Sequence, residues 1–142
     1  IDRSALVPYT QDEMFALVSD VDSYPGFLPW CCGAKTLSRE GDQVDARIDF
    51  MVSGVKKSFT THNRYVDHAA IEMALIDGPF SELKGRWEFV PLGADGCRIS
   101  LYLQYDFSSR VVRLVTAPVF GQIANSLVDA FQKRAAQVYG ER

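Results

Sequence analysis

The sequence predicts an α+β fold in which a curved antiparallel sheet wraps around one long C-terminal helix. Five stretches between residues 44 and 107 alternate apolar and polar residues with period two, the pattern of half-buried strands. Apolar residues then recur at helical spacing from residue 109 to 139. A one-sided sheet must cover its apolar face, and this chain has a single long amphipathic helix with which to cover it.

Length and composition fit one domain spanning residues 1–142. The chain is 47% hydrophobic and 23% charged, which is ordinary for a globular protein. Its net charge of -3 argues against a broad nucleic-acid surface, which is normally basic. No apolar stretch approaches the ~20 residues expected of a membrane-spanning helix. The chain begins at Ile1 instead of methionine, so the natural protein could have further residues before Ile1.

The N-terminal elements are a strand over residues 3–9 and a helix to about residue 20. Thr10 and Glu13 have the spacing of a capping box, which opens a helix. The next segment, Tyr24–Cys31, holds four large apolar side chains and two prolines. Each proline fixes a φ angle and removes an N–H donor, so we expect a stiff, non-regular segment. Such a segment is suited to cover the mouth of an apolar cavity.

Short turns separate the five strands, so the sheet is expected to be an antiparallel meander. The strands run over 44–52, on to residue 65 after a turn at Ser53-Gly54, and over 71–77, 83–89 and 97–107. In the C-terminal helix, an interior proline costs ~3 kcal/mol. We therefore expect a short piece ending near Val115 and a main helix starting with Pro118, capped by Gly140.

A strongly bent sheet opposed by a single helix is expected to leave space between the two. We expect an apolar cavity of roughly 300–1,000 Å³ there, the usual size of a small-molecule site.

Segments that carry a family resemblance span nearly the whole chain. They are Ala5–Tyr9 with the following helix, Tyr24–Cys31, Phe59–Thr61, Asp77–Phe80, Leu83–Phe89, Cys97–Ile99, Ala130-Phe131 and Arg134-Ala135. With them the chain resembles the START-like (helix-grip, polyketide cyclase/dehydrase) superfamily. Within it the chain is similar to the coenzyme Q-binding family, which includes the bacterial ribosome-association toxin.

The resemblance implies a noncatalytic protein that binds ubiquinone, an isoprenoid quinone, as a ligand and supports respiratory electron transport. The alternative that it implies is an inhibitor that binds the large ribosomal subunit and blocks subunit joining. A cyclase or hydrolase is the third reading. We expect no required cofactor. We expect a cytoplasmic location with peripheral contact at the inner face of the membrane. The sequence does not determine the oligomeric state.

The candidate ligand-binding residues come from the proline-rich segment, the inward strand positions and the sheet-facing stripe of the helix. They are Tyr24, Phe27, Leu28, Trp30, Phe50, Met73, Phe80, Trp87, Leu101, Leu103, Tyr105, Val119, Phe120, Ile123 and Leu127. Of these, Phe27, Leu28 and Trp30 are expected to touch lipid. Each set also has a plainer interpretation as ordinary core.

Catalytic and metal-binding patterns are not expected. The two histidines, His62 and His68, fall on a strand and a turn, away from each other. Acidic residues sit at outward strand positions; they are Asp49, Glu72, Glu82, Glu88 and Asp106. Three cysteines, two of them adjacent, lack zinc-site spacing and fit buried thiols in a reducing compartment. Basic residues of the C-terminal helix would contact RNA or anionic lipid; they are Arg110, Arg113, Lys133 and Arg134.

Overall fold

Seven antiparallel strands form one sheet in the order β1-β7-β6-β5-β4-β3-β2 in the computed structural model, which describes residues 1–142. The elements in chain order are β1 (Asp2–Val7), α1 (Gln11–Ser19), the 3₁₀ helix η1 (Val21–Gly26), β2 (Cys31–Glu40), β3 (Gln43–Val52), β4 (Val55–Val66), β5 (Ala70–Asp77), β6 (Phe80–Leu92), β7 (Gly96–Phe107) and α2 (Arg110–Tyr139). The predicted fold class, a curved sheet around a long C-terminal helix, is confirmed.

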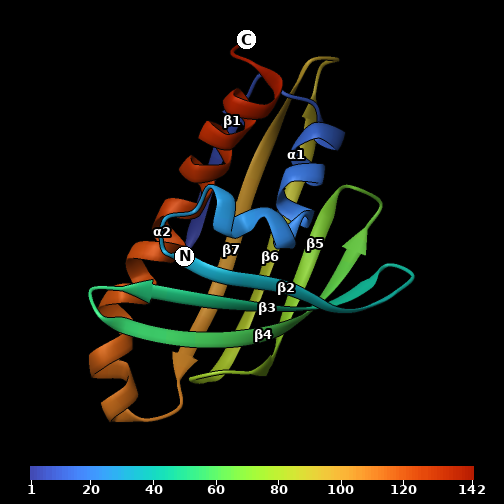
Figure 1. Cartoon of the computed structure of the whole chain (residues 1–142). Coiled ribbons are helices and arrows are strands. Elements are labelled where there is room, and N and C mark those ends of the chain that lie inside the picture. Colours follow the sequence, from blue (N-terminus) through green and yellow to red (C-terminus); the bar gives the residue numbers. More distant parts are fainter.

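The sheet bends so strongly that β2, β3 and β4 run crosswise to β6 and β7 (Figure 1). Register shifts help it bend, and one lies between Thr60 and Thr61 where β4 pairs with β5. Gly85 in β6 matters for the same reason. A Cβ there would lie 2.8 Å from a Leu103 methyl, 2.9 Å from the Met73 methyl and 3.0 Å from the Tyr102 carbonyl oxygen, so a larger residue would displace these two side chains.

The predicted N-terminal strand and helix are present, although the strand spans Asp2–Val7 and stops short of the predicted residue 9. Thr10 caps α1 by accepting a hydrogen bond from the Glu13 N–H, and the Glu13 carboxylate accepts one from the Thr10 N–H. The proline-rich segment was predicted to be non-regular, and this was wrong for its first part. Val21–Gly26 is a 3₁₀ helix with Pro25 as its fifth of six residues, and short 3₁₀ segments of this kind are common connectors between other elements.

The strand β2 was missed altogether. Its pairing with β3 shifts register between Cys31 and Gly33 and again between Thr36 and Ser38. Each shift breaks the two-residue period on which the prediction depended.

The expected break in the C-terminal helix was wrong. Helix α2 runs unbroken for 30 residues with Pro118 inside it, and Gly140 caps it as predicted. Proline removes the donor that would reach the carbonyl of Leu114, four residues earlier. Leu114 lies on the outer side of the helix and is 72% exposed, so solvent can reach this turn.

The N-terminal half of α2 is apolar on its outer side as well as its inner side. Val111, Leu114 and Val115 are at least half exposed. By length and composition, α2 therefore includes an 18-residue window apolar enough to cross a membrane, although 33% of that window is buried in the fold. The expectation that no such stretch exists was wrong.

The hydrophobic core is divided into two clusters. The larger, of 19 buried residues, joins α1, η1 and the C-terminal half of α2 to the sheet, with Phe131 and Phe89 at its centre. The smaller, of 8 buried residues, packs the middle of α2 through Phe120 against Phe50 and Phe80. Separate clusters mean that the two halves of α2 are held by different parts of the sheet.

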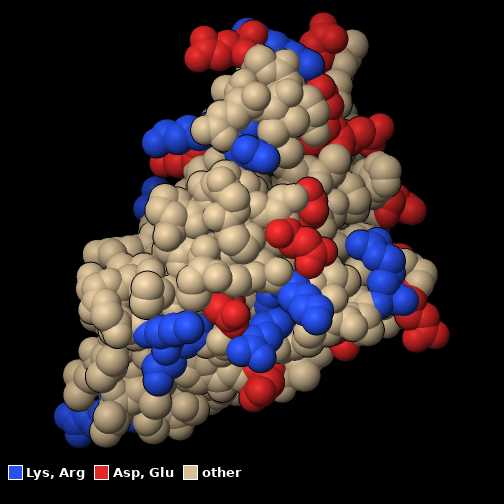
Figure 2. Space-filling model, in the orientation of Figure 1, with Lys and Arg blue, Asp and Glu red and all other residues tan.

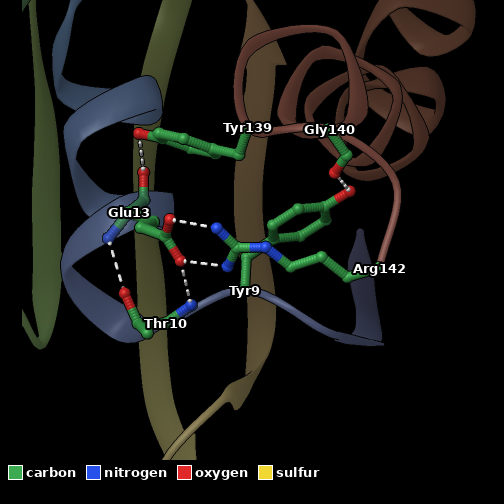
Figure 3. A network of polar contacts seen from close by, with 6 residues as sticks. All are labelled: Tyr9, Thr10, Glu13, Tyr139, Gly140 and Arg142. Carbon is green, nitrogen blue, oxygen red and sulfur yellow. Dashed lines mark hydrogen bonds and ion pairs between the residues drawn. The ribbon is translucent and has the colours of Figure 1, made fainter.

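Polar contacts fasten the C-terminal end of α2 to the N-terminal end of α1 (Figure 3). Tyr139 donates a hydrogen bond to the Glu13 carbonyl at 2.9 Å, and Tyr9 donates one to the Gly140 carbonyl at 2.9 Å. The Arg142 guanidinium pairs with both oxygens of the Glu13 carboxylate at 2.7 and 2.9 Å. This pairing and the cap at Thr10 lower the pKa of Glu13 to about 2. We call these contacts the C-terminal clasp.

Candidate hydrophobic-ligand site

A cavity lies between α2 and the curved sheet, at the boundary of the two core clusters. Its wall includes Trp87 and Phe131 from the larger cluster and Phe120 and Ile123 from the smaller one. Its volume is about 80 Å³, and 16 of its 18 lining residues are hydrophobic. An apolar cavity at the boundary between two packed clusters can bind an apolar ligand.

Nine of the fifteen candidate residues line this cavity. They are Tyr24, Trp30, Met73, Trp87, Leu101, Leu103, Phe120, Ile123 and Leu127. The other nine lining residues were outside the candidate set, although most were predicted to face inward; they are Val21, Ala46, Ile48, Phe59, Thr61, Asn63, Leu83, Ala124 and Phe131. Their inward strand positions and the helix stripe were the signals that could have found them.

Six candidates do not line the cavity. Phe50, Phe80 and Val119 are buried in the smaller cluster, and Tyr105 packs against it. Phe27 and Leu28 lie instead beside a groove on the outer surface. Leu28 is buried there, which is incompatible with the expectation that it touches lipid.

The cavity is smaller than expected. Its volume of about 80 Å³ falls below the predicted range and is about half of the ~150 Å³ apolar cavity known to hold a benzene ring. The aromatic side chains explain the difference, because the Phe120 ring has four ring neighbours at centroid distances of 4.8 to 5.9 Å, namely Tyr105, Phe80, Phe50 and Phe59. A ring-sized guest must therefore displace side chains.

Trp30 and Ile123 form the part of the cavity wall through which a guest could enter. Both line the cavity, and both also line an outer groove of about 430 Å³ that reaches Met51 and Gln122. Trp30 further borders a second groove of about 410 Å³ along α2, beside Phe27 and Arg134. One half-buried indole thus separates the interior from two surface grooves.

The polar groups of the cavity are few. Thr61 and Asn63 are each 5% exposed, and the Thr61 hydroxyl donates a hydrogen bond to the Asn63 Oδ1 at 2.8 Å. Tyr24 directs its hydroxyl away, donating to the Val18 carbonyl, and burial raises the pKa of Tyr24. The lining includes no carboxylate, histidine, lysine or arginine.

The acidic residues that were considered for catalysis lie on the outer face of the sheet, and several of them form ion pairs with arginines there. Asp49 pairs with Arg47 at 2.9 Å, and Glu72 and Glu88 both pair with Arg86. His62 contacts Asp45 and Gln43 outside the cavity. The ionisable pairs named here are not among the residues that line the cavity.

The cysteines differ in their surroundings. Cys31 and Cys97 are buried, and desolvation raises the pKa of each thiol to about 11, so both are protonated at neutral pH. Cys32 is exposed, unlike the buried thiol expected for it. No group of three or more His, Cys, Asp or Glu side chains is placed to hold a metal.

Sequence comparison identifies the family. A family model described as "Polyketide cyclase / dehydrase and lipid transport" matches residues 7–132. The chain belongs to this family. Its fold matches that of a START superfamily protein from Mycobacterium smegmatis with a TM-score of 0.81 at 24% identity, covering 97% of each chain.

Similar proteins carry different names. The Ribosome association toxin RatA of Escherichia coli K12 is 42% identical over 100% of this chain and 90% of its own length. RatA of Pseudomonas aeruginosa is 44% identical over 99% and 97%. The mitochondrial Coenzyme Q-binding protein COQ10 homolog B of Xenopus laevis is 24% identical over 99% of this chain and 59% of its own length.

A solved enzyme also shares the fold. The Zhui aromatase/cyclase from Streptomyces sp. R1128 has a TM-score of 0.85 at 14% identity, covering 96% of this chain and 93% of its own. A likeness at this identity concerns the fold alone, because one scaffold hosts many activities.

Proposed function

We propose that this protein associates with the ribosome and hinders the joining of its subunits. The observation that carries the proposal is the full-length similarity, at 42% and 44% identity, to two proteins named Ribosome association toxin RatA. The alternative interpretation of the sequence is therefore favoured over respiration as the main role. A noncatalytic role also agrees with a cavity that has no ionisable pair facing it.

Helix α2 supplies the surface best suited to ribosomal RNA. It carries four cationic residues, Arg110, Arg113, Lys133 and Arg134, against one anionic residue, in a chain whose net charge is -3. Cationic side chains contact phosphates. Figure 2 shows blue atoms at the lower end of the molecule, where α2 begins, beside a largely uncharged flank.

The groove beside the C-terminal half of α2 combines charge with aromatic rings. Lys133 and Arg134 line it together with Phe27 and Trp30, and the Arg134 guanidinium lies 4.8 Å from the centre of the Phe27 ring. Unpaired RNA bases stack on such rings while cations bind the backbone. We place the RNA contact in this groove.

Ribosome profiles of cells that express the chain test the role. We expect sucrose gradients to show separated subunits accumulating at the expense of joined ribosomes. The double variant Lys133→Glu with Arg134→Glu should abolish the effect. A matched variant, Lys84→Glu with Arg98→Glu, makes the same charge change at exposed positions of β6 and β7 and should retain it. Unchanged profiles with the wild-type chain would overturn the proposal.

A second function, binding of a hydrophobic ligand, is favoured by the apolar cavity. We propose that the ligand is an isoprenoid quinone, in keeping with the similarity to the COQ10 homolog. A single isoprene unit contributes roughly 3 to 4 kcal/mol when buried, at ~0.8 kcal/mol per methylene. Because the cavity holds about 80 Å³, most of the tail would stay outside it. A tail left in the bilayer would place this cytoplasmic protein peripherally on the inner membrane face.

Extraction of the purified protein with organic solvent, followed by mass spectrometry, tests the second function. We expect a stoichiometric quinone from protein made in quinone-producing cells. Protein that carries no lipid, and that takes up none from quinone-containing vesicles, would contradict it.

A further inference from the structure

We propose that Asn63 is a specificity-determining residue that selects a neutral, largely apolar ligand carrying a carbonyl oxygen. The inference rests on the proposed hydrophobic-ligand role and names the chemistry that this role requires. Asn63 is 5% exposed and lines the cavity from β4, so its amide is withdrawn from bulk solvent. The Thr116 hydroxyl is the one fully enclosed side-chain polar atom without a partner, so the Asn63 Nδ2 is not sealed in the core and can meet an acceptor on a bound molecule.

The orientation of the Asn63 amide is fixed by its neighbour. Thr61 donates its hydroxyl hydrogen to the Asn63 Oδ1 at 2.8 Å, so the Nδ2 group lies at the edge of the amide that faces away from Thr61. Thr61 and Asn63 are two residues apart and share the inward face of β4. The backbone groups of this strand are engaged in pairing with β3 and β5.

The Nδ2 donors have no partner within the protein. The hydrogen bond to Thr61 is the only one that the Asn63 side chain makes. The other hydroxyl of the lining, that of Tyr24, is already donating to the Val18 carbonyl. Trp87 lines the same wall and is 4% exposed. The polar part of the cavity therefore offers donors and lacks a matching acceptor.

These donors define the ligand class. An acceptor oxygen with little other polarity, such as the carbonyl of a quinone, ketone or ester, would complete the amide's hydrogen bonding. A carboxylate is disfavoured because the lining contains no cation to compensate its burial. A pure hydrocarbon would fill the space and leave the Nδ2 group unpaired.

A matched ligand pair isolates the carbonyl contribution. Acetophenone and ethylbenzene have nearly the same shape and differ by one carbonyl oxygen. Their dissociation constants are measured by amide chemical-shift titration on the wild-type protein and on Asn63→Leu, which keeps the side-chain size. Met73→Leu is the control, because it alters the cavity wall and leaves the amide in place.

We expect Asn63→Leu to shift the ratio of the two dissociation constants toward ethylbenzene by about tenfold, equal to ~1.4 kcal/mol. The control should change the ratio less than about twofold, ~0.4 kcal/mol. Equal changes for both ligands in Asn63→Leu would overturn the role of Asn63 while leaving hydrophobic binding intact. Failure of either ligand to bind the wild-type protein would overturn the hydrophobic-ligand role itself.

Infrared spectroscopy provides a readout that does not depend on the variant folding. The carbonyl stretch of acetophenone bound to the wild-type protein should lie at lower frequency than in hexane, as a hydrogen-bonded carbonyl does. A stretch at the hexane frequency would contradict the proposal.

Discussion

Different interactions hold the two ends of α2 against the rest of the fold. The C-terminal end packs on the 19-residue cluster and is fastened by the C-terminal clasp of Tyr9, Glu13, Tyr139 and Arg142. The N-terminal half rests on the 8-residue cluster, borders the cavity, and leaves Val111 and Leu114 exposed. Because α2 is held more firmly at its C-terminal end, its N-terminal half can move away from the sheet more easily. Enlargement of the cavity is therefore expected there.

The largest expected effect on stability comes from a substitution in the larger core cluster. Phe131 is 1% exposed, and its ring lies 5.5 to 5.6 Å from those of Tyr24, Phe27 and Trp87. Phe131→Ala should lower the free energy of unfolding by ~4 kcal/mol, because it leaves an unfilled space. Urea denaturation measures the change. The half-buried Val112, which packs on the smaller cluster from the N-terminal half of α2, should lose ~2 kcal/mol at most when changed to Ala; equal losses would erase the contrast.

Opening the cavity wall tests the loose side. Trp30→Ala removes the indole that separates the cavity from both outer grooves. We expect bound acetophenone to exchange about tenfold faster, equal to ~1.4 kcal/mol in the barrier. NMR line-shape analysis measures the rate. Phe27→Ala is the matched control, because Phe27 borders the groove and not the cavity; the same acceleration there would place the entrance elsewhere.

Removing the ion pair of the clasp should make a smaller change. Glu13→Gln preserves a capping residue for α1 but loses the charge that pairs with Arg142. We expect a loss of ~1 kcal/mol at neutral pH, since the pair is partly exposed.

The pH dependence gives the sign of this contribution. The pKa of Glu13 is about 2 in the folded protein against an ordinary value of 4.5. Its stabilisation is therefore complete above about pH 4.5 and is lost as the pH falls toward 2. Thermal melts of the wild-type chain should show that loss, and Glu13→Gln should show less of it. Parallel pH profiles for the two proteins would contradict the role of the clasp.

The smallest effect is expected at Thr116. Its hydroxyl is fully buried in α2 and has no hydrogen-bond partner. Thr116→Val keeps the shape and removes the unpaired group, so stability should stay the same or rise by up to ~1 kcal/mol. Calorimetry measures the difference. A clear loss of stability would show that the hydroxyl has a partner after all.

The sequence predicted the fold well where one local signal dominates. The Thr10 capping box and the alternation in β3, β4 and β7 follow directly from residue order. Strand β2 was missed because two register shifts interrupt its period. The break at Pro118 was wrong because packing of the helix on the sheet outweighs one lost hydrogen bond.

The site was predicted in part for a related reason. Alternation tells which face a side chain lies on, but not how far along the strand the cavity ends. Phe50 therefore faces inward as expected and yet fills the smaller cluster, and Phe80, from the segment interpreted as a turn, is buried in the same cluster. Asn63 was overlooked as a site residue because only its three-dimensional setting reveals the unpaired donors.

Native-state hydrogen exchange along α2 tests the central claim most directly, because each amide reports the free energy of its own opening. We predict that amides of residues 128–138 are protected about a hundredfold more than those of residues 114–122, a difference of ~2.7 kcal/mol. Uniform protection along the whole helix would mean that α2 opens as one rigid unit, and would contradict the account.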